Sequence, residues 1–396
     1  MRYDLIIVGG GLVGAGLAAA LQMSGLQIAL IDARMPSSND PRLFALNAGS
    51  CQFLDNLNLW DELSSFASPI HQVHISEQGR FGAVRLNRDD VHLSSLGHVI
   101  PARYIEGALN ERLLSLPNVT LYRPATLKTL EQDSAGVILT IEKSDGTEVL
   151  TSKLVIAADG TASTVRSLLN IKTEVFDYEQ SALVTRTILA RPHAQIAYER
   201  FQDDGAIAML PLINNECATI WSASTDRITE LMNLSDADFL AALQESFGYR
   251  LGRLKGISQR HVFPLKMVQA EKAVEGNVFL LGNAAHTLHP IAAQGFNLAL
   301  YEVAILVETI LAKRDEIHAA DLQRVSEKIK KQQKTSIGVS HRISQVFASK
   351  SRLAAIATQL GMMGLDIATP LKRHFISGIM GRSGRVPRLL LNTKDL

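Results

Sequence analysis

The sequence has 396 residues but only two cysteines, Cys51 and Cys217. Two cysteines cannot form a disulfide scaffold or a cysteine-rich metal site, and they suit a reducing compartment such as the cytoplasm. The 11 histidines show neither HxH nor HxxxH spacing. The sequence therefore predicts no metal site.

Long apolar runs are also missing. No stretch reaches the ~20 apolar residues that a membrane-spanning helix needs, and the first residues have neither the apolar core nor the cleavage site of a signal peptide. The composition, 46% hydrophobic and 20% charged, is that of a globular chain rather than a disordered one. At ~150 residues per domain the length predicts two to three domains, and we expect the protein in the cytoplasm.

A strong net charge is absent from the whole chain but not from its end. The overall net charge of +1 gives no reason to expect nucleic-acid binding. Residues 328–396, however, carry 13 Lys and Arg against 2 Asp and Glu, a net of +11, and leave the rest at −10. Apolar residues between 353 and 379 recur at helical spacing among these basic residues. Such a face either packs on the rest of the chain or contacts an anionic membrane surface, a partner enzyme or a second copy, and the sequence leaves these readings open.

A glycine-rich turn near the N-terminus lies between a predicted strand, residues 5–8, and a predicted helix, residues 15–24. The turn carries Gly9, Gly11 and Gly14 in the spacing GxGxxG, and Asp32 follows the next predicted strand, residues 27–31. Gly9 permits the tight turn, Gly11 lets a pyrophosphate approach the backbone, and Gly14 lets helix and strand pack closely. The helix N-terminus faces the phosphate charge, and Asp32 can accept hydrogen bonds from ribose hydroxyls. This arrangement predicts a dinucleotide site, without separating FAD from NAD.

A second motif begins with an apolar strand at residues 154–158. The strand runs into Asp159 and Gly160, and a predicted helix with Arg166 in its first turn follows. Taken alone, this is a common way for a strand to end.

A third motif begins with a buried strand that ends in Gly282-Asn283-Ala284-Ala285-His286. A proline-containing loop then leads to Gly295 at the start of a helix predicted over residues 297–313. Small residues let a bulky ring lie on the backbone, and the helix N-terminus offers free N–H groups. Three such turns fit one extended cofactor. No second GxGxxG follows a strand, so we expect no second Rossmann domain for a nicotinamide.

The middle of the chain alternates short apolar runs with Gly, Asp and Asn clusters, which predicts strands and turns. The predicted strands cover residues 73–75, 119–122, 137–141, 154–158, 206–212 and 218–223. Helices are predicted over 105–115 and 236–247, the second capped by Asp236. After Lys328 the chain has a helical pattern.

These motifs resemble those of the class A flavoprotein aromatic hydroxylases, the family that includes para-hydroxybenzoate hydroxylase. GxGxxG, the Asp-Gly turn and Gly-Asn-Ala-Ala-His stand in that family's order, and the match extends over essentially the whole chain. The similarity is to the ubiquinone-biosynthesis hydroxylases in particular, through residues 40–50, the Glu-Arg-Phe segment at 199–201, and residues 289–297. Within that group the chain most resembles the 2-octaprenyl-6-methoxyphenol hydroxylases, at residues 73–76, 209–212 and 247–252.

The resemblance implies an α/β fold with a Rossmann-like FAD-binding domain, built on a parallel sheet and interleaved with a strand-rich substrate domain. A helical C-terminal region follows. We expect the discontinuous FAD-binding domain over residues 1–70, 98–177 and 263–345, the substrate domain over 71–97 and 178–262, and the basic helical region over 346–396.

The resemblance also implies which residues bind FAD. The three glycines of the first turn would hold the diphosphate, with Asp159 beside it, and Asp32 would bind the adenosine ribose. Arg42 and Arg103 would contact the cofactor, and Leu127 would flank the adenine through its backbone.

The flavin end of the cofactor would meet the third motif. Asn283 stands where many relatives have Asp and can still bond a ribityl hydroxyl. Gly295 and Asn297 would lie at the pyrimidine end of the isoalloxazine. His286 and His289 lie on the same loop and are either catalytic bases or hydrogen-bonded structural histidines.

The implied activity is an FAD-dependent monooxygenase that hydroxylates the aromatic ring of a polyprenylated phenol, of 2-polyprenyl-6-methoxyphenol type, in ubiquinone biosynthesis. Reduced flavin would react with O2 to give a C4a-hydroperoxide, whose distal oxygen attacks the ring. NAD(P)H or another reductant would supply the electrons. The implied partners are the substrate and other ubiquinone-biosynthesis enzymes, and no residue is assignable as the base for the phenol.

Two other functions stay open. An FAD-dependent prenyl reductase shares the same motifs, and a flavin-binding scaffold of a ubiquinone-biosynthesis complex would share them without catalysis. The scaffold reading rests on Ala293 and Ala299, which stand where relatives have glycine; Glu302 likewise replaces the usual Asp.

Overall fold

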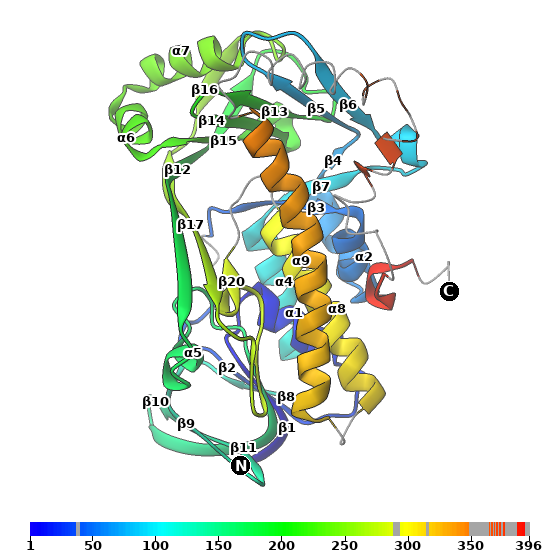
Figure 1. Ribbon diagram of the computed structural model, residues 1–396, viewed down its shortest axis with the longest axis vertical. Coiled ribbons are helices and arrows are strands. Elements are labelled where there is room, and N and C mark those ends of the chain that lie inside the picture. Colours follow the sequence, from blue (N-terminus) through cyan, green and yellow to red (C-terminus); the bar gives the residue numbers. More distant parts are fainter. Residues whose placement is uncertain are drawn as a thin grey trace.

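The computed structural model describes two lobes, each built on one large sheet (Figure 1). The described residues are 1–36, 40–287, 294–313, 317–347 and 386–392, together with Gly364, Asp366, Ala368, Pro370, Lys372, Arg373, Phe375 and Ile376.

The first lobe contains an eight-stranded sheet in the order β18-β19-β11-β1-β2-β8, with β10 and β9 continuing from β11. Its strands are β1 (Arg2–Val8), β2 (Ile28–Ile31), β8 (Val119–Tyr122), β9 (Ala125–Asp133), β10 (Gly136–Lys143), β11 (Gly146–Ala157), β18 (Val274–Glu275) and β19 (Val278–Leu280). β19, β11, β1, β2 and β8 run parallel, and β9, β10 and β11 form an antiparallel meander. The central strands are apolar on both sides because both faces of this sheet are covered.

Helices cover the faces of this sheet. They are α1 (Leu12–Ala20), α2 (Ala48–Asn56), α3 (Trp60–Leu63), α4 (Ala102–Leu114), α5 (Thr164–Leu168), α8 (Gln294–Lys313) and α9 (Ala319–Phe347). Helix α1 packs between α4 and α8, where its Leu17, Ala18 and Ala19 are fully buried. Gly295–Lys313 is the one helix of the described residues that is long and apolar enough to cross a membrane, but most of it is buried inside the fold, as in a core helix.

The second lobe contains a nine-stranded sheet in the order β20-β17-β12-β15-β14-β13-β5-β6, with β16 beside β12. Its strands are β5 (Gln72–Glu77), β6 (Ala83–Asn87), β12 (Thr173–Leu189), β13 (Ile196–Gln202), β14 (Gly205–Pro211), β15 (Glu216–Ser224), β16 (Leu254–Ile257), β17 (His261–Ala270) and β20 (His286–Thr287). The long strands β12 and β17 run from this lobe towards the first (Figure 1).

The two faces of the nine-stranded sheet have different neighbours. One face is covered by α6 (Thr225–Asn233) and α7 (Asp236–Phe247), which bury Phe239 and Phe247 with Trp221. The other face packs against a small antiparallel sheet of β3 (Leu43–Asn47), β7 (Gly97–Pro101) and β4 (Ser68–Ile70). Short 3₁₀ turns complete the chain at Ser64–Phe66, Arg88–Val91, Ile213–Asn215, Gly282–Ala284 and Arg388–Leu390.

The predicted fold class is confirmed, and every predicted strand coincides with an observed one. Two predicted details of the helices were wrong. The first helix spans Leu12–Ala20 rather than 15–24, because it starts directly in the glycine turn. The cap of α7 is Ser235, whose hydroxyl accepts a hydrogen bond from the Asp238 amide at 3.1 Å, so Asp236 is the first helical residue.

Most of the apolar stripe predicted over residues 353–379 lies outside the described residues. Ile376 is only 3% exposed, and it and Phe375 join the apolar cluster beneath the small sheet. Arg373 donates to the Asp90 carbonyl at 2.7 Å, and Lys372 pairs with Asp366 at 3.5 Å. At these positions the C-terminal region packs on its own chain.

Candidate functional site

The three turns singled out in the sequence follow three neighbouring parallel strands, β1, β11 and β19. The Ala158 amide donates to the Val8 carbonyl at 2.7 Å, and the Leu281 amide donates to the Ala157 carbonyl at 2.8 Å. Because parallel strands end at the same edge of a sheet, the turns lie side by side, at the edge where doubly wound sheets bind ligands.

The glycines of the first turn have distinct roles. Gly9 has φ +105°, and a Cβ there would overlap the Ala158 carbonyl of the second motif. A Cβ on Gly14 would overlap the Gly9 carbonyl, so the helix can start here only with glycine. Gly11 is different, because a Cβ there would meet nothing within 4 Å. Gly9 and Gly14 are needed for packing, whereas Gly11 faces open space.

Asp32 holds the glycine turn in place. One carboxylate oxygen accepts from the Gly10 amide at 2.8 Å and the other from the Arg34 amide at 2.9 Å. A carboxylate has about four acceptor positions, so further donors, such as ribose hydroxyls, can still bind to it.

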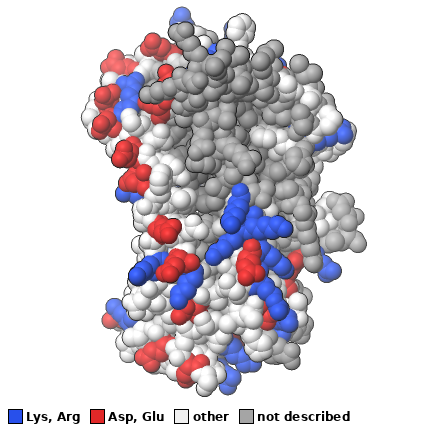
Figure 2. Space-filling model, viewed as in Figure 1, with Lys and Arg blue, Asp and Glu red and all other residues white. Residues whose placement is uncertain are grey.

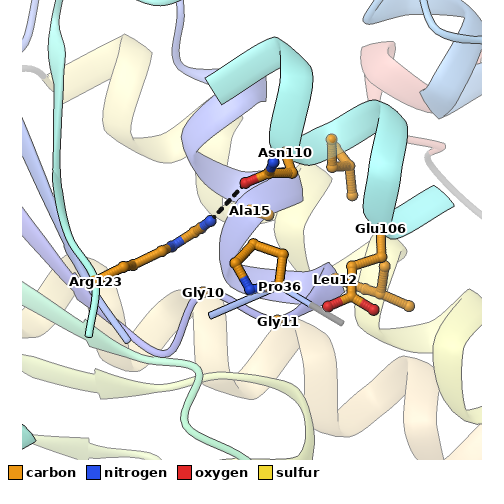
Figure 3. Close-up of a pocket in the computed structure, with 9 residues that line it drawn as sticks. Gly10, Gly11, Leu12, Ala15, Pro36, Glu106, Asn110 and Arg123 are labelled. Atoms are coloured by element: carbon orange, nitrogen blue, oxygen red, sulfur yellow. Dashed lines mark hydrogen bonds between the residues drawn. The ribbon is translucent and has the colours of Figure 1, made fainter. Parts of the chain in front are cut away.

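A pocket beside this turn contains a residue that the sequence motifs did not reveal, Arg123 (Figure 3). Arg123 follows β8 directly and donates to the Asn110 side chain of α4 at 2.8 Å. Its Nε and Nη2 atoms are buried and have no partner among the described residues. Burial lowers the pKa of Arg123, and the nearby carboxylates Asp32 and Glu106 act in the opposite direction. No spacing rule marks this residue, because it reaches the glycine turn only through the order of strands in the sheet.

The second motif also holds a buried polar atom without a partner. Asp159 accepts from the Val165 amide at 3.1 Å through Oδ2, while its Oδ1 is buried and unpaired among the described residues. Arg166 joins the second and third motifs by donating to the Thr161 and Ala284 carbonyls at 2.7 and 2.9 Å.

The third turn is held by a buried carboxylate on α8. Glu302 is 1% exposed and accepts hydrogen bonds from the Gly282 amide at 3.1 Å and the Gln333 side chain at 3.2 Å. It also bonds His286 Nε2 at 2.5 Å. Burial alone would lower the pKa of His286, but the Glu302 carboxylate overcomes it and raises that pKa. The geometry of His286 is that of a hydrogen-bonded structural histidine, with its Nδ1 unpaired among the described residues. His289 and Ala293 lie outside the described residues.

Three other predicted residues lie in the third motif or at the start of α8. Asn283 is exposed. A Cβ on Gly295 would meet nothing within 4 Å. The Asn297 side chain donates to the Ala45 carbonyl at 2.8 Å and accepts from the Asn47 amide at 2.9 Å, which ties α8 to β3.

The remaining predicted residues lie further from the glycine turn along the chain. Arg42 is paired with Asp40, which accepts from Arg42 Nε at 2.9 Å, and this bond raises the pKa of Arg42. Arg103 lies at the start of α4 with its guanidinium 4.6 Å from the ring centre of Tyr104. Leu127 is buried in β9 opposite Ile141.

These features fit a dinucleotide cofactor. Unpaired guanidinium donors at Arg123 and an unpaired acceptor at Asp159 lie around a glycine turn that is open at Gly11. Buried polar atoms rarely stay unpaired in proteins, so a ligand with both acceptors and hydroxyl donors completes this site.

Comparison with known proteins supports the same conclusion. Residues 2–322 match the family described as "FAD binding domain". The chain is 30% identical over 387 residues to "Ubiquinone hydroxylase UbiL" of Rhodospirillum rubrum, covering 96% of this chain and 89% of the relative. It is 30% identical over 317 residues to the 3-demethoxyubiquinol 3-hydroxylase of Escherichia coli, covering 78% and 80%. The fold is similar to the crystal structure of p-nitrophenol 4-monooxygenase from Pseudomonas putida, with a TM-score of 0.81 at 17% identity over 97% of this chain and 99% of that one. This chain therefore belongs to the class A flavoprotein aromatic hydroxylases, within the ubiquinone hydroxylase family, and is an FAD-dependent monooxygenase.

Proposed function

We propose that this enzyme hydroxylates the aromatic ring of a polyprenylated phenol, of 2-polyprenyl-6-methoxyphenol type, in ubiquinone biosynthesis. The observation that carries the proposal is the 30% identity to a ubiquinone hydroxylase over nearly the full length of both chains. When bound, reduced FAD activates dioxygen, and one oxygen atom enters the aromatic ring of the substrate. The electrons come from NAD(P)H or another reductant.

The proposed FAD site uses the residues that meet at the edge of the first sheet. Gly9, Gly11 and Gly14 hold the diphosphate with Asp159, and Asp32 binds the adenosine ribose. We add Arg123 to this end because its buried Nε and Nη2 lack partners among the described residues.

Arg42, Arg103 and Leu127 complete the proposed adenosine side of the site. Asn283, Gly295 and Asn297 lie at the flavin side in the proposal. The side chain of Asn297 already bonds β3, so Asn297 meets the flavin through its backbone amide.

The proposed domain division follows the two large sheets except at β12, β17 and β20. The FAD-binding domain comprises residues 1–70, 98–177 and 263–345, and the substrate domain comprises 71–97 and 178–262. The strands β5, β6 and β13–β16 fall in the second set. β12 and β17 cross the boundary and connect the lobes (Figure 1).

Oxygen consumption tests the proposal. The purified protein should be yellow from bound FAD, and an oxygen electrode should record one O2 consumed for each hydroxylated product formed from a polyprenylphenol and NADH or NADPH. A prenyl reductase would form product without consuming oxygen, and a scaffold would form none. A deletion strain that accumulates the unhydroxylated quinone precursor would support the same role in the cell.

We further propose that the enzyme is cytoplasmic and reaches its lipid substrate at an anionic membrane surface. Basic side chains gather in the middle of the face shown in Figure 2, over α9. Lys330 and Lys334 are exposed on α9 and, four residues apart, share one side of it. A basic residue near such a surface contributes about 1 kcal/mol of attraction.

Vesicle sedimentation tests the membrane proposal. Replacing both lysines by Gln should weaken binding to phosphatidylserine vesicles on the order of 30-fold at low salt, while replacing both by Arg should not. Equal binding by the two double variants would remove the membrane from the proposal and leave a partner enzyme or a second copy as the reason for the basic surface.

A further inference from the structure

Strand β13 places one carboxyl on the apolar face of the nine-stranded sheet. Glu199 lies in register between Ile75 of β5 and Ala208 of β14, and the row continues to Val84 on β6 and Ile220 on β15. Partners in register point to the same face of a sheet. Glu199 is therefore the one charged side chain in a row of apolar residues.

The Glu199 carboxyl has no partner within the described part of the chain. The next residue, Arg200, does not pair with it, because Arg200 points to the opposite face and donates to the Ser246 carbonyl at 3.0 Å. The Glu199 side chain is half-buried, and its removal from water raises its pKa to about 7. Other titratable groups on this face are Glu77, which is paired with Arg80 at 3.0 Å in the next row, and His261 at the far end of the row. Arg186 and Glu216, further along β12 and β15, pair with each other at 3.8 Å.

This face of the sheet points towards the flavin side of the proposed site. Ile75 and Ile220 pack against the apolar cluster that also contains Ala45 of β3. The Ala45 carbonyl accepts the hydrogen bond from Asn297 at the start of α8. The strand β3 itself, Leu43–Asn47, brings no titratable group to the face. The Glu199 carboxyl thus stands in apolar surroundings on the side of the sheet that meets the flavin-binding end of α8.

We propose that Glu199 is the catalytic base that takes the proton from the phenol hydroxyl of the substrate. The inference rests on the proposed function, since it requires a phenol as substrate. The motif Glu199-Arg200-Phe201 was one of the segments that carry the family resemblance, and this assignment gives its first residue a chemical role.

The proton balance is simple. A free phenol has a pKa near 10, as for tyrosine, and its neutral ring is a weaker nucleophile than the phenolate. The phenol O–H proton moves to the Glu199 carboxylate, which becomes a neutral carboxylic acid, and the phenolate ring carbon takes up the oxygen atom that the monooxygenase reaction supplies. The ring then loses its C–H proton to solvent as aromaticity returns, and Glu199 gives its proton back to the phenolate oxygen. A base with a pKa near the working pH is the efficient one for such a transfer.

The test compares the full-length holoenzyme with its Glu199→Gln variant, which keeps the shape of the side chain but cannot take a proton. Product formation from a polyprenylphenol should fall about 100-fold at pH 7, within the range typical of a general base. The acid limb of the pH–rate profile, which reports a group with a pKa of about 7, should disappear. FAD content should be unchanged.

Two matched measurements separate a base from a structural residue. Glu216→Gln removes a carboxyl from the same sheet, where Glu216 pairs with Arg186 at 3.8 Å, and should keep the parental rate and profile. A ring-fluorinated polyprenylphenol that is already ionised at neutral pH needs no base, so the rates of Glu199→Gln and the parent enzyme should become equal with it.

Several results would overturn the inference. Parental activity and an intact acid limb in Glu199→Gln would show that the carboxyl takes no proton. An equal loss with the ordinary and the pre-ionised phenol would show that Glu199 only shapes the site. A parent enzyme that binds FAD but hydroxylates neither phenol would instead refute the proposed function, and this outcome is visible before any variant is made.

Discussion

Among the polar groups on the two large sheets that lack a full set of partners, Arg123 and Glu199 have opposite chemistry. At the edge of the eight-stranded sheet, Arg123 keeps two unpaired donor atoms beside the glycine turn. On the nine-stranded sheet, Glu199 keeps an unpaired acceptor in an apolar row. A buried polar group without a partner costs about 1–3 kcal/mol. Arg123 lacks an acceptor, which a cofactor can provide, whereas Glu199 lacks a proton, which a substrate can provide.

The contrast is sharpened by a third buried group, Glu302. It has three partners, the Gly282 amide, Gln333 and His286. A buried carboxylate with three partners maintains the shape of the third turn. The structure therefore separates a carboxylate with three partners on α8 from an unpaired one on the nine-stranded sheet.

The largest expected effect comes from the glycine turn. Gly11→Val should give a folded but colourless protein, because the new side chain points into the open space proposed for the diphosphate. Gly14→Val should instead fail to fold, since its Cβ would overlap the Gly9 carbonyl. Flavin absorbance and circular dichroism separate the two outcomes. FAD bound normally by Gly11→Val would contradict the proposed position of the diphosphate.

This pair of glycines also shows how far the sequence could predict the site. GxGxxG determines its own local geometry at two of its glycines, because a Cβ on Gly14 would overlap the Gly9 carbonyl and a Cβ on Gly9 would overlap the Ala158 carbonyl. The sequence did not predict a role for Arg123, because this residue reaches Gly10 only through the placement of β8 beside β2. The sequence also did not predict the hydrogen bond between His286 and Glu302. The two residues are 16 positions apart, one on a strand and the other on a helix.

The face of a strand was equally hard to predict. Glu199 and Arg200 are adjacent, so their side chains point to opposite faces of the strand. From the sequence alone, either face could be the one in water. Only the pairing with β5 and β14 shows that Glu199 is on the apolar face. The fold class could be predicted from local patterns, whereas the role of single polar residues depended on contacts between distant strands.

Breaking the satisfied carboxylate should have the next largest effect. Glu302→Ala leaves the buried His286 without its partner and should lower the free energy of unfolding by about 3–5 kcal/mol. Because Glu302 raises the pKa of His286, the pairing stabilises fully below the unfolded value near 6.5 and fades as the pH rises through the raised pKa. Urea unfolding at pH 6 and pH 9 measures this change. Glu327→Ala, at an exposed position of α9, is the control, and a penalty independent of pH would contradict the ion pair.

Substitution of the unpaired carboxylate should have the opposite effect on stability, although the stability again falls as the pH rises. The pKa of Glu199 is raised from 4.5 to about 7 in the folded protein, so the folded state binds more protons than the unfolded state between these values. Stability is therefore lost as the pH rises from about 4.5 to 7. Glu199→Gln removes this loss and should be more stable than the parent by roughly 2 kcal/mol at pH 8, with little difference at pH 4.5. Thermal unfolding at both pH values checks the sign, and a variant that is less stable at pH 8 would show that the carboxylate has a partner in the folded state.

The smallest expected effect concerns the unpaired cation. Arg123→Ala removes donors that the structure leaves available beside the glycine turn, and a hydrogen bond to a charged group contributes about 1.5–3 kcal/mol. The dissociation constant of FAD, measured by fluorescence quenching, should rise at least about tenfold, while the stability of the apoprotein should change little because only the Asn110 bond is lost. Arg112→Ala is the matched control on the neighbouring helix: Arg112 bonds Gln22 at 2.5 Å, so its loss should reduce stability and leave FAD affinity unchanged. If the two variants bind FAD equally well, the unpaired atoms of Arg123 do not contact the cofactor. Glu199 would then be the one group of this comparison that still has a proposed ligand.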